Sequence, residues 1–166
     1  MVILWEFLFI MINLFKKDNN LYAPANGILK DITECDDSVF SKKMIGDGYF
    51  IEPIEGKIYS PCSGTVESVF PTKHAFGFKL ANGAEVILHI GLDTVKLEGG
   101  ILKSQIKEGS KVKKGDLLVT YDPEETKRLN VKMPIIVVVL DGKTEHIKNG
   151  LDKEIKQGNL VIEMGD

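Results

Sequence analysis

The chain has 166 residues, the length of one domain that can bury a substantial core. Its 21 basic and 24 acidic side chains give a formal net charge of −3, which argues against nucleic acid as a partner because nucleic-acid-binding proteins present a basic face. Arg128 is the only arginine, so the chain itself offers little for a bidentate clamp on phosphate. Cys35 and Cys62 lack CxxC spacing, which favours free thiols and a cytoplasmic location.

Residues 1–20 are predicted to be an apolar N-terminal leader outside the core, and residues 21–166 a single domain. The first fifteen residues contain one charged side chain, Glu6, and are followed by Lys16 and Lys17. This run is shorter than the about 20 apolar residues that a membrane span needs, and it lacks the features of a secretory signal. Either it lies on a membrane surface with the lysines at the headgroups, or it precedes a functional start at Met11.

Short β-type runs separated by glycines begin at Leu21, with no sustained helical periodicity. This pattern predicts an all-β fold, an antiparallel β-sandwich or barrel with at most short helices. Residues 22–27 and 59–64 share the pattern Tyr-x-Pro-x-x-Gly, and each copy predicts a strand, a turn and a second strand. Two copies of one strand-turn-strand unit indicate a pseudo-symmetric sandwich.

A hairpin is predicted around Asn82-Gly83, the dipeptide typical of a two-residue type I′ turn. If Ala81 faces Ala84, Phe76 opposes His89 and His74 opposes Gly91. Because side chains alternate along a strand, one face of this hairpin would carry His74, Phe76, Phe78, Ile87, His89 and Gly91. The two histidine rings would then come together, and Val86, Leu88 and Ile90 would face the core.

Two further elements follow the hairpin. Residues 123–130 are expected to form one or two helical turns. Residues 134–142 form a β-branched run that predicts a central buried strand.

Two imidazoles on one apolar face favour two kinds of chemistry. One is a metal site, in which His74 and His89 ligate zinc with a third ligand such as Asp93 or a group from a partner. The other is phosphoryl transfer, in which one neutral imidazole attacks phosphorus and the other donates a hydrogen bond.

Several motifs in order resemble one family. The segment "TKHAFGFKLANGAEVILHIGLDTVKLEG", preceded by "MIGDGYFIEP" and "YSPCSGTV", resembles the glucose-class IIA domain of the bacterial phosphoenolpyruvate-dependent sugar phosphotransferase system. The resemblance covers residues 21–164. It implies an antiparallel β-sandwich that acts as a phosphotransferase component without a cofactor. It also implies that His89 takes a phosphoryl group from the carrier protein HPr, that His74 assists with Thr72 beside it, and that a cysteine on the IIB domain of a sugar permease receives the group.

A docking surface is predicted around the histidines. Because the site lacks a local arginine, the donor partner would bring the positive charge that phosphoryl transfer needs. We predict a shallow apolar dish with an acidic rim. The dish consists of Val39, Phe40, Met44, Ile45 and Phe70, and the rim of Asp36, Asp37, Asp47 and Asp93. Asp93 is the favoured acidic residue, because its segment continues directly from His89.

Two alternatives compete with the carrier function. A biotinyl or lipoyl carrier would present its modified lysine at a hairpin tip, whereas Lys132 precedes a buried apolar run. A zinc hydrolase of related β fold would need an H-x-H pair, which the chain lacks. His146 is expected on the surface in a polar loop, and Cys62 in a structural turn.

Overall fold

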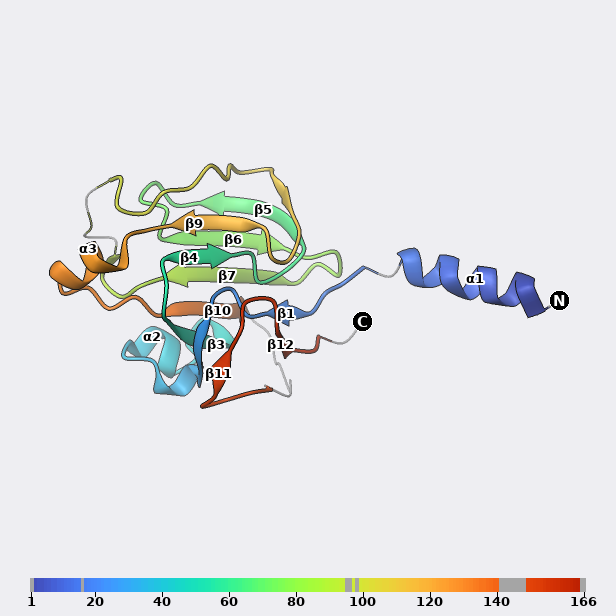
Figure 1. Cartoon of the computed structure of the whole chain (residues 1–166), viewed down its shortest axis with the longest axis horizontal. Helices are drawn as coiled ribbons and strands as arrows, with labels where there is room; N and C mark the ends of the chain where they lie inside the picture. Colours follow the sequence, from blue (N-terminus) through green and yellow to red (C-terminus); the bar gives the residue numbers. More distant parts are fainter. Residues whose placement is uncertain (1, 16, 95–96, 98, 141–148, 165–166) are drawn as a thin grey trace.

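The computed structural model describes residues 2–15, 17–94, 97, 99–140 and 149–164, so the prediction for His146 lies outside the described residues. The fold is the predicted antiparallel β-sandwich (Figure 1). Its large sheet contains, in spatial order, β11 (Glu154–Ile155), β2 (Gly27–Asp31), β3 (Gly46–Pro53), β10 (Ile135–Leu140), β7 (Glu85–Ile90), β6 (Ala75–Lys79), β5 (Gly64–Val69) and β8 (Lys111–Val112). Two small sheets pair β1 (Leu21–Tyr22) with β12 (Leu160–Ile162), and β4 (Lys57–Tyr59) with β9 (Leu117–Thr120).

The two faces of the large sheet bury different sets of side chains, as the alternation along β10 shows. Ile135, Val137 and Val139 belong to the main core, whereas Ile136 and Val138 point to the opposite face. There they join a smaller apolar group, which we call the outer cluster. The outer cluster consists of Ile32, Cys35, Phe40, Phe50, Ile136 and Val138, with Ile45 and Leu92 packed against it. β10 is thus the central buried strand that its sequence predicts.

The internal repeat appears as reciprocal hydrogen bonds between its two copies. Tyr22 N–H donates to the Pro61 carbonyl, and Tyr59 N–H donates to the Pro24 carbonyl, both at 2.8 Å. Each copy also places its strands in matching sheets, because β1 and β4 belong to the small sheets while β2 and β5 belong to the large one. The repeated Tyr-x-Pro-x-x-Gly pattern therefore forms the junction of a pseudo-symmetric sandwich.

Short helical segments connect the strands. The 3-10 helix η1 (Ile32–Glu34) and α2 (Ser38–Ser41) follow β2, and α3 (Pro123–Arg128) occupies the predicted helical turns. Aspartates cap them, since Asp37 accepts a hydrogen bond from Val39 N–H and Asp122 accepts one from Glu124 N–H. These caps allow helices of one or two turns to form where the sequence has no helical periodicity.

The hairpin of β6 and β7 differs from the prediction by one residue. Ala75, not Phe76, is opposite His89, and Phe76 is opposite Leu88. The loop contains three residues rather than two, because Leu80 N–H donates to the Ala84 carbonyl at 2.9 Å and Gly83 closes the turn with φ of 86°. This register places Phe76 and Phe78 in the main core, where they are almost fully buried.

The N-terminal helix α1 (Val2–Phe15) projects away from the sandwich (Figure 1). Its apolar side chains are exposed, including Ile3 at 81% and Trp5 at 74%. None of the described helices is long and apolar enough to cross a membrane. The chain joins the body before residue 21, because the Asp18 carboxylate accepts hydrogen bonds from Tyr22 and Lys114, and Asn20 accepts one from Met164 N–H.

Candidate active site

His89 lies in the middle of the large sheet, on the side of the outer cluster. It is opposite Ala75 on β6 and Ile136 on β10, and it is half-buried. Its ring centroid lies 5.2 Å from that of Phe40, which α2 places over the sheet. Two neighbouring strands and one short helix therefore fix the position of this imidazole.

His74 reaches the same place from the loop that precedes β6. The loop is closed by a hydrogen bond from Phe70 N–H to the Ala75 carbonyl at 3.0 Å, and Lys73 adopts a left-handed φ of 61°. The Thr72 hydroxyl is hydrogen-bonded to Nδ1 of His74. The Phe70 ring contacts the His74 ring edge-on at 5.2 Å, and His74 is only 7% exposed.

The two imidazole rings meet, although not in the way that strand alternation predicted. Their centroids are 5.2 Å apart and their planes are inclined by 78°. In the observed register His74 precedes β6, and its carbonyl accepts a hydrogen bond from Ile90 N–H at 2.7 Å, so it does not share a regular strand face with His89. The strained loop, rather than the pleat of the strand, directs the His74 ring toward His89.

The surroundings favour uncharged imidazoles. Burial lowers the pKa of His74 below its ordinary value of 6.5. Burial also lowers the pKa of His89, and the nearby His74 lowers it further, while the Gly91 backbone and the Asp37 carboxylate oppose this effect. Nδ1 of His89 is buried and makes no hydrogen bond of normal geometry with the described residues. Nε2 is therefore the His89 nitrogen that an incoming reagent can reach.

The turn after β7 depends on Gly91 and on Thr94, a residue that the sequence reasoning missed. Gly91 has φ of 76°, and a Cβ built on it would lie 2.2 Å from the Thr94 methyl group. Thr94 is buried, and its hydroxyl donates to the Ile90 carbonyl at 2.5 Å. The "GLDT" sequence carries this signal, because a glycine at a left-handed position and a threonine three residues later form a compact turn.

Five apolar residues were predicted to be exposed in the docking dish, and for Phe40 this prediction is wrong. Val39, Met44 and Phe70 are 40%, 67% and 48% exposed, and Ile45 is half-buried. Phe40 is only 7% exposed and belongs to the outer cluster. The reason is the short helix α2, whose neighbouring positions point in different directions, so that Val39 faces outward while Phe40 packs on the sheet. Phe40 thus supports the dish from below.

The predicted acidic rim contains four carboxylates with different surroundings. Asp93 is exposed in the turn after β7 and has a left-handed φ of 58°. Asp37 is half-buried at the start of α2, and its charge acts on the pKa of His89. Asp47 pairs with Lys43 at 3.2 Å and accepts a hydrogen bond from Gly48 N–H at 2.7 Å. Asp36 pairs with Lys132 at 2.5 Å.

The zinc and lysine-carrier alternatives gain no geometric support. Among the described residues, no group of three or more His, Cys, Asp and Glu side chains is arranged to hold a metal ion. Lys132 lies in the segment that enters β10 rather than at a hairpin tip, and its ammonium is paired with Asp36. Cys62 is fully buried, and burial raises the pKa of its thiol to about 12, so it stays protonated at cellular pH.

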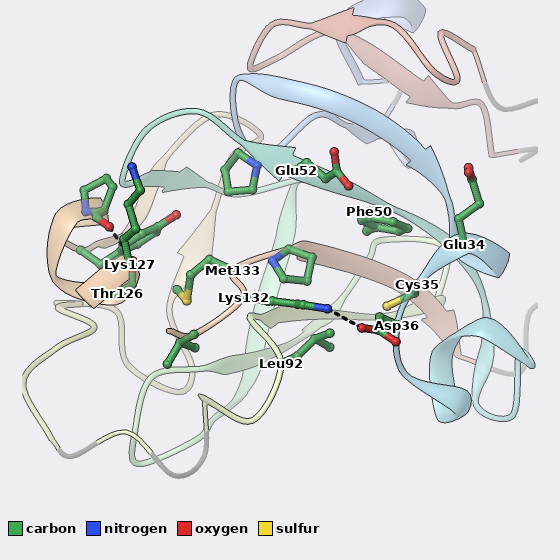
Figure 2. A pocket seen from close by; sticks show the side chains of 15 residues that line it. Glu34, Cys35, Asp36, Phe50, Glu52, Leu92, Thr126, Lys127, Lys132 and Met133 are labelled. Carbon is green, nitrogen blue, oxygen red and sulfur yellow. Dashed lines mark hydrogen bonds and ion pairs between the residues drawn. The ribbon is translucent and has the colours of Figure 1, made fainter. Parts of the chain in front are cut away.

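A cavity of about 470 Å³ lies beside this site, between η1, α3 and the segment that enters β10. Figure 2 shows Lys132 extending across it toward Asp36. Two lining residues, Cys35 and Phe50, belong to the outer cluster, and a third, Leu92, packs against it. It is therefore adjacent to the layer that supports His89, and sequence reasoning did not find it.

Comparison with known proteins decides the family. Residues 19–145 match the family model of the phosphoenolpyruvate-dependent sugar phosphotransferase system, EIIA 1. The chain belongs to this EIIA family. It is 41% identical over 150 residues to a PTS system glucose-specific EIIA component of Mycoplasma capricolum, an alignment that covers 89% of this chain and 96% of that protein. The solved structure of glucose permease IIA from Mycoplasma capricolum aligns with a TM-score of 0.77 at 39% identity, covering 89% of this chain and 96% of that chain.

Membership of this family makes the chain a phosphotransferase component of a sugar transport system. The EIIA unit also occurs inside longer relatives. A PTS system glucose-specific EIICBA component of Streptococcus pneumoniae is 47% identical over 122 residues, which cover 74% of this chain and 17% of that protein. The resemblance drawn from the sequence motifs is thereby confirmed.

The different burial of Phe40 and Met44 gives a first prediction. Phe40→Ala should lower the free energy of unfolding by about 3–5 kcal/mol, because it removes a buried ring from the outer cluster. Met44→Ala should change it by less than about 0.5 kcal/mol, since that side chain is exposed. Denaturant titration of both variants measures the difference. Equal losses would contradict the assignment of Phe40 to the outer cluster.

The lowered histidine pKa values give a second prediction. Well above pH 6.5 both rings are neutral in the folded and in the unfolded chain. As the pH falls toward the lower folded pKa values, the histidines of the unfolded chain bind more protons than those of the folded chain. The free energy of unfolding should therefore fall as the pH drops from 6.5 through the folded pKa values. The loss should be smaller in the double variant His74→Gln/His89→Gln. Denaturant titration of both proteins at about pH 7.5 and about pH 5.5 gives the loss in the free energy of unfolding for each. Equal losses in the two proteins would contradict the prediction.

Proposed function

We propose that the chain is a phosphohistidine carrier of the cytoplasm. His89 accepts a phosphoryl group from HPr, His74 assists, and a cysteine on the IIB domain of a sugar permease receives the group. The observation that carries this proposal is the pair of imidazoles with centroids 5.2 Å apart, in which a neighbouring hydroxyl fixes a ring nitrogen of buried His74, while Nδ1 of half-buried His89 has no partner among the described residues. The family membership supports the same role.

The transfer is a displacement at phosphorus. The lone pair of His89 Nε2 attacks the phosphorus of the donor's phosphohistidine, and the donor nitrogen leaves with the electrons of the broken P–N bond. In the second step a cysteine thiolate of the acceptor attacks the same phosphorus, and Nε2 of His89 leaves. A neutral His89 is required for the first step, which is consistent with the lowering of its pKa by burial.

His74 is suited to stabilise the phosphoryl oxygens. A Thr72 hydroxyl that donates to Nδ1 of His74 places the ring proton on Nε2, where it becomes a hydrogen-bond donor. The inclined arrangement of the two rings lets this donor approach a group bound on His89. Such a donor acts where charge develops during transfer.

The surface around the histidines suits a basic partner. Val39, Met44 and Phe70 offer exposed apolar contacts, and Phe40 and Ile45 support them from below. Asp37 and Asp93 would attract positive charge carried by the partner. Arg128, the only arginine, is exposed in α3, so the positive charge for the transfer would come from the partner. The EIIA match within an EIICBA component supports a IIB unit as the acceptor.

A third prediction separates the roles of the two histidines. Glutamine can donate a hydrogen bond as imidazole does, but it has no nitrogen able to bond phosphorus. His89→Gln should therefore accept no phosphate. His74→Gln should still accept it from HPr but pass it to a IIB domain more slowly, because a neutral amide cannot become cationic. Incubation with phosphoenolpyruvate, the general phosphotransferase enzyme and HPr, followed by intact-mass measurement, tests this.

The control for these variants is the folded state. Both should retain cooperative unfolding, so that a loss of phosphate acceptance reflects chemistry. Phosphate on His89→Gln would show that another residue is the nucleophile, and none on folded His74→Gln would show that the roles are reversed.

We further propose that α1 is a leader that rests on an anionic membrane surface and is not needed for the fold. Its exposed apolar side chains have no partner in the described part of the sandwich, and an exposed apolar surface of this size is typical of an interaction site. A surface cavity near the chain's exit from α1 is lined by Lys17, Lys79, Lys111 and Lys113, as well as Asp18 and Glu67. These lysines would contact lipid phosphates while the helix enters the interface.

The fourth prediction concerns this leader. The full chain should sediment with vesicles of phosphatidylcholine and phosphatidylglycerol, and less with phosphatidylcholine alone. A chain that starts at Met11 should not sediment, yet should unfold with the same cooperativity and accept phosphate. Equal sedimentation of both chains would refute the membrane contact. Loss of cooperative unfolding in the shorter chain would show that α1 packs into the fold.

A further inference from the structure

The cavity beside the histidine pair combines an apolar floor with charged walls. Phe50, Leu92 and Met133 contribute apolar surface. Three carboxylates, from Glu34, Asp36 and Glu52, line it together with two ammonium groups, from Lys127 and Lys132. Its volume of about 470 Å³ is large enough to receive a long side chain.

One of these lysines already shows how the cavity holds a cation. The Lys132 side chain extends over the cavity, and its ammonium meets the Asp36 carboxylate at 2.5 Å (Figure 2). The two side chains are 71% and 75% exposed. Exposed ion pairs contribute little to stability because water and salt screen them. Lys132 can therefore leave Asp36 at little cost to the stability of the fold.

The cavity borders the proposed docking surface, because Asp36 of the acidic rim is one of its lining residues. Gly91 N–H donates to the Pro134 carbonyl at 2.8 Å, and Leu92 N–H donates to the Lys132 carbonyl at 3.0 Å. The turn that follows His89 is thus tied to the segment that carries Lys132. On the other wall, Asp36 immediately precedes Asp37, whose charge acts on His89. A protein docked on His89 would lie beside the mouth of the cavity.

We propose that this cavity receives a lysine or arginine side chain of HPr, the proposed phosphate donor to His89, and that Lys132 occupies its place in the free chain. The incoming cation would replace the Lys132 ammonium at Asp36, and its aliphatic stem would lie on Phe50, Leu92 and Met133. This inference rests on the proposed carrier function and adds a contact that neither the histidine motif nor the apolar dish provides.

Charge supports an incoming cation rather than an anion. Glu34 already lies 3.9 Å from Lys30, so the charge that favours a cation resides at Asp36. Displacement of Lys132 leaves the Asp36 carboxylate in need of a new positive partner. Lys132 therefore competes with the partner for Asp36, which makes removal of its charge favourable to binding. An ordinary acidic rim behaves differently. There, a nearby lysine either leaves the affinity for the partner unchanged or lowers it only through long-range repulsion, and it does not compete for one carboxylate.

The test is a double-mutant cycle on the binding of unphosphorylated HPr, measured by isothermal titration calorimetry at low salt. Lys132→Met keeps the stem and removes the ammonium, so it should tighten binding by about two- to five-fold. Asp36→Asn should weaken binding by a similar factor. In the double variant the gain from Lys132→Met should vanish, because it depends on the Asp36 carboxylate.

Lys114→Met is the matched control. It breaks an exposed pair with Asp18 at 2.8 Å, and Lys114 N–H contacts Ser63 at the start of β5, far along the sheet from His89. This variant removes the same charge and should leave the affinity unchanged.

Three results would overturn the proposal. Binding that Lys132→Met leaves unchanged or weakens would exclude the exchange at Asp36. An equal gain in Lys114→Met or in the double variant would show that only net charge matters. Phosphate acceptance by the unaltered chain is measured in parallel. If the unaltered chain takes phosphate from HPr but the variants lack the predicted changes in affinity, the cavity contact alone is refuted. A chain that neither binds HPr nor takes its phosphate refutes both proposals.

Discussion

The site depends on holding two imidazole rings against each other in a partly buried space. Positive charge there would be costly, because burial lowers the pKa of both rings and the nearby His74 lowers the pKa of His89 further. The rings are instead fixed by neutral contacts, with Phe40 beside His89 and with Phe70 and Thr72 beside His74. The surroundings therefore favour neutral, oriented imidazoles, which is the state that the proposed transfer of a phosphoryl group from HPr to His89 requires.

The outer cluster connects this constraint to the fold. It packs α2 and η1 on the face of the large sheet opposite the main core, so the helix that carries Phe40 is tied to the strand that carries His89. Asp37 contributes twice, since it caps α2 and its carboxylate opposes the lowering of the pKa of His89. Stability and chemistry are consequently linked through the same short segment, and exposed Val39 and Met44 are held in place by a buried neighbour.

Local patterns predicted much of this structure. The Tyr-x-Pro-x-x-Gly repeat, the β-branched run of β10 and the helical turns of α3 all follow from turn chemistry and side-chain shape, which act over a few residues. The motifs around His74 and His89 indicated the family and drew attention to Thr72, which is hydrogen-bonded to His74. The burial of Phe40 was not predictable in the same way, because four helical residues show no periodicity from which an inward face could be identified.

The sequence by itself determined most strands and turns and the two histidines proposed to carry the chemistry, since these depend on neighbours along the chain. The tertiary structure decided the register of β6 and β7, because the burial of Phe76 and Phe78 in the main core favours a three-residue loop over the two-residue turn that Asn82-Gly83 suggests. It also decided how the rings meet, through the loop before β6. The cavity with its Lys132–Asp36 pair belongs to the tertiary structure alone, because its walls come from segments that are distant in sequence and meet only when the sandwich closes.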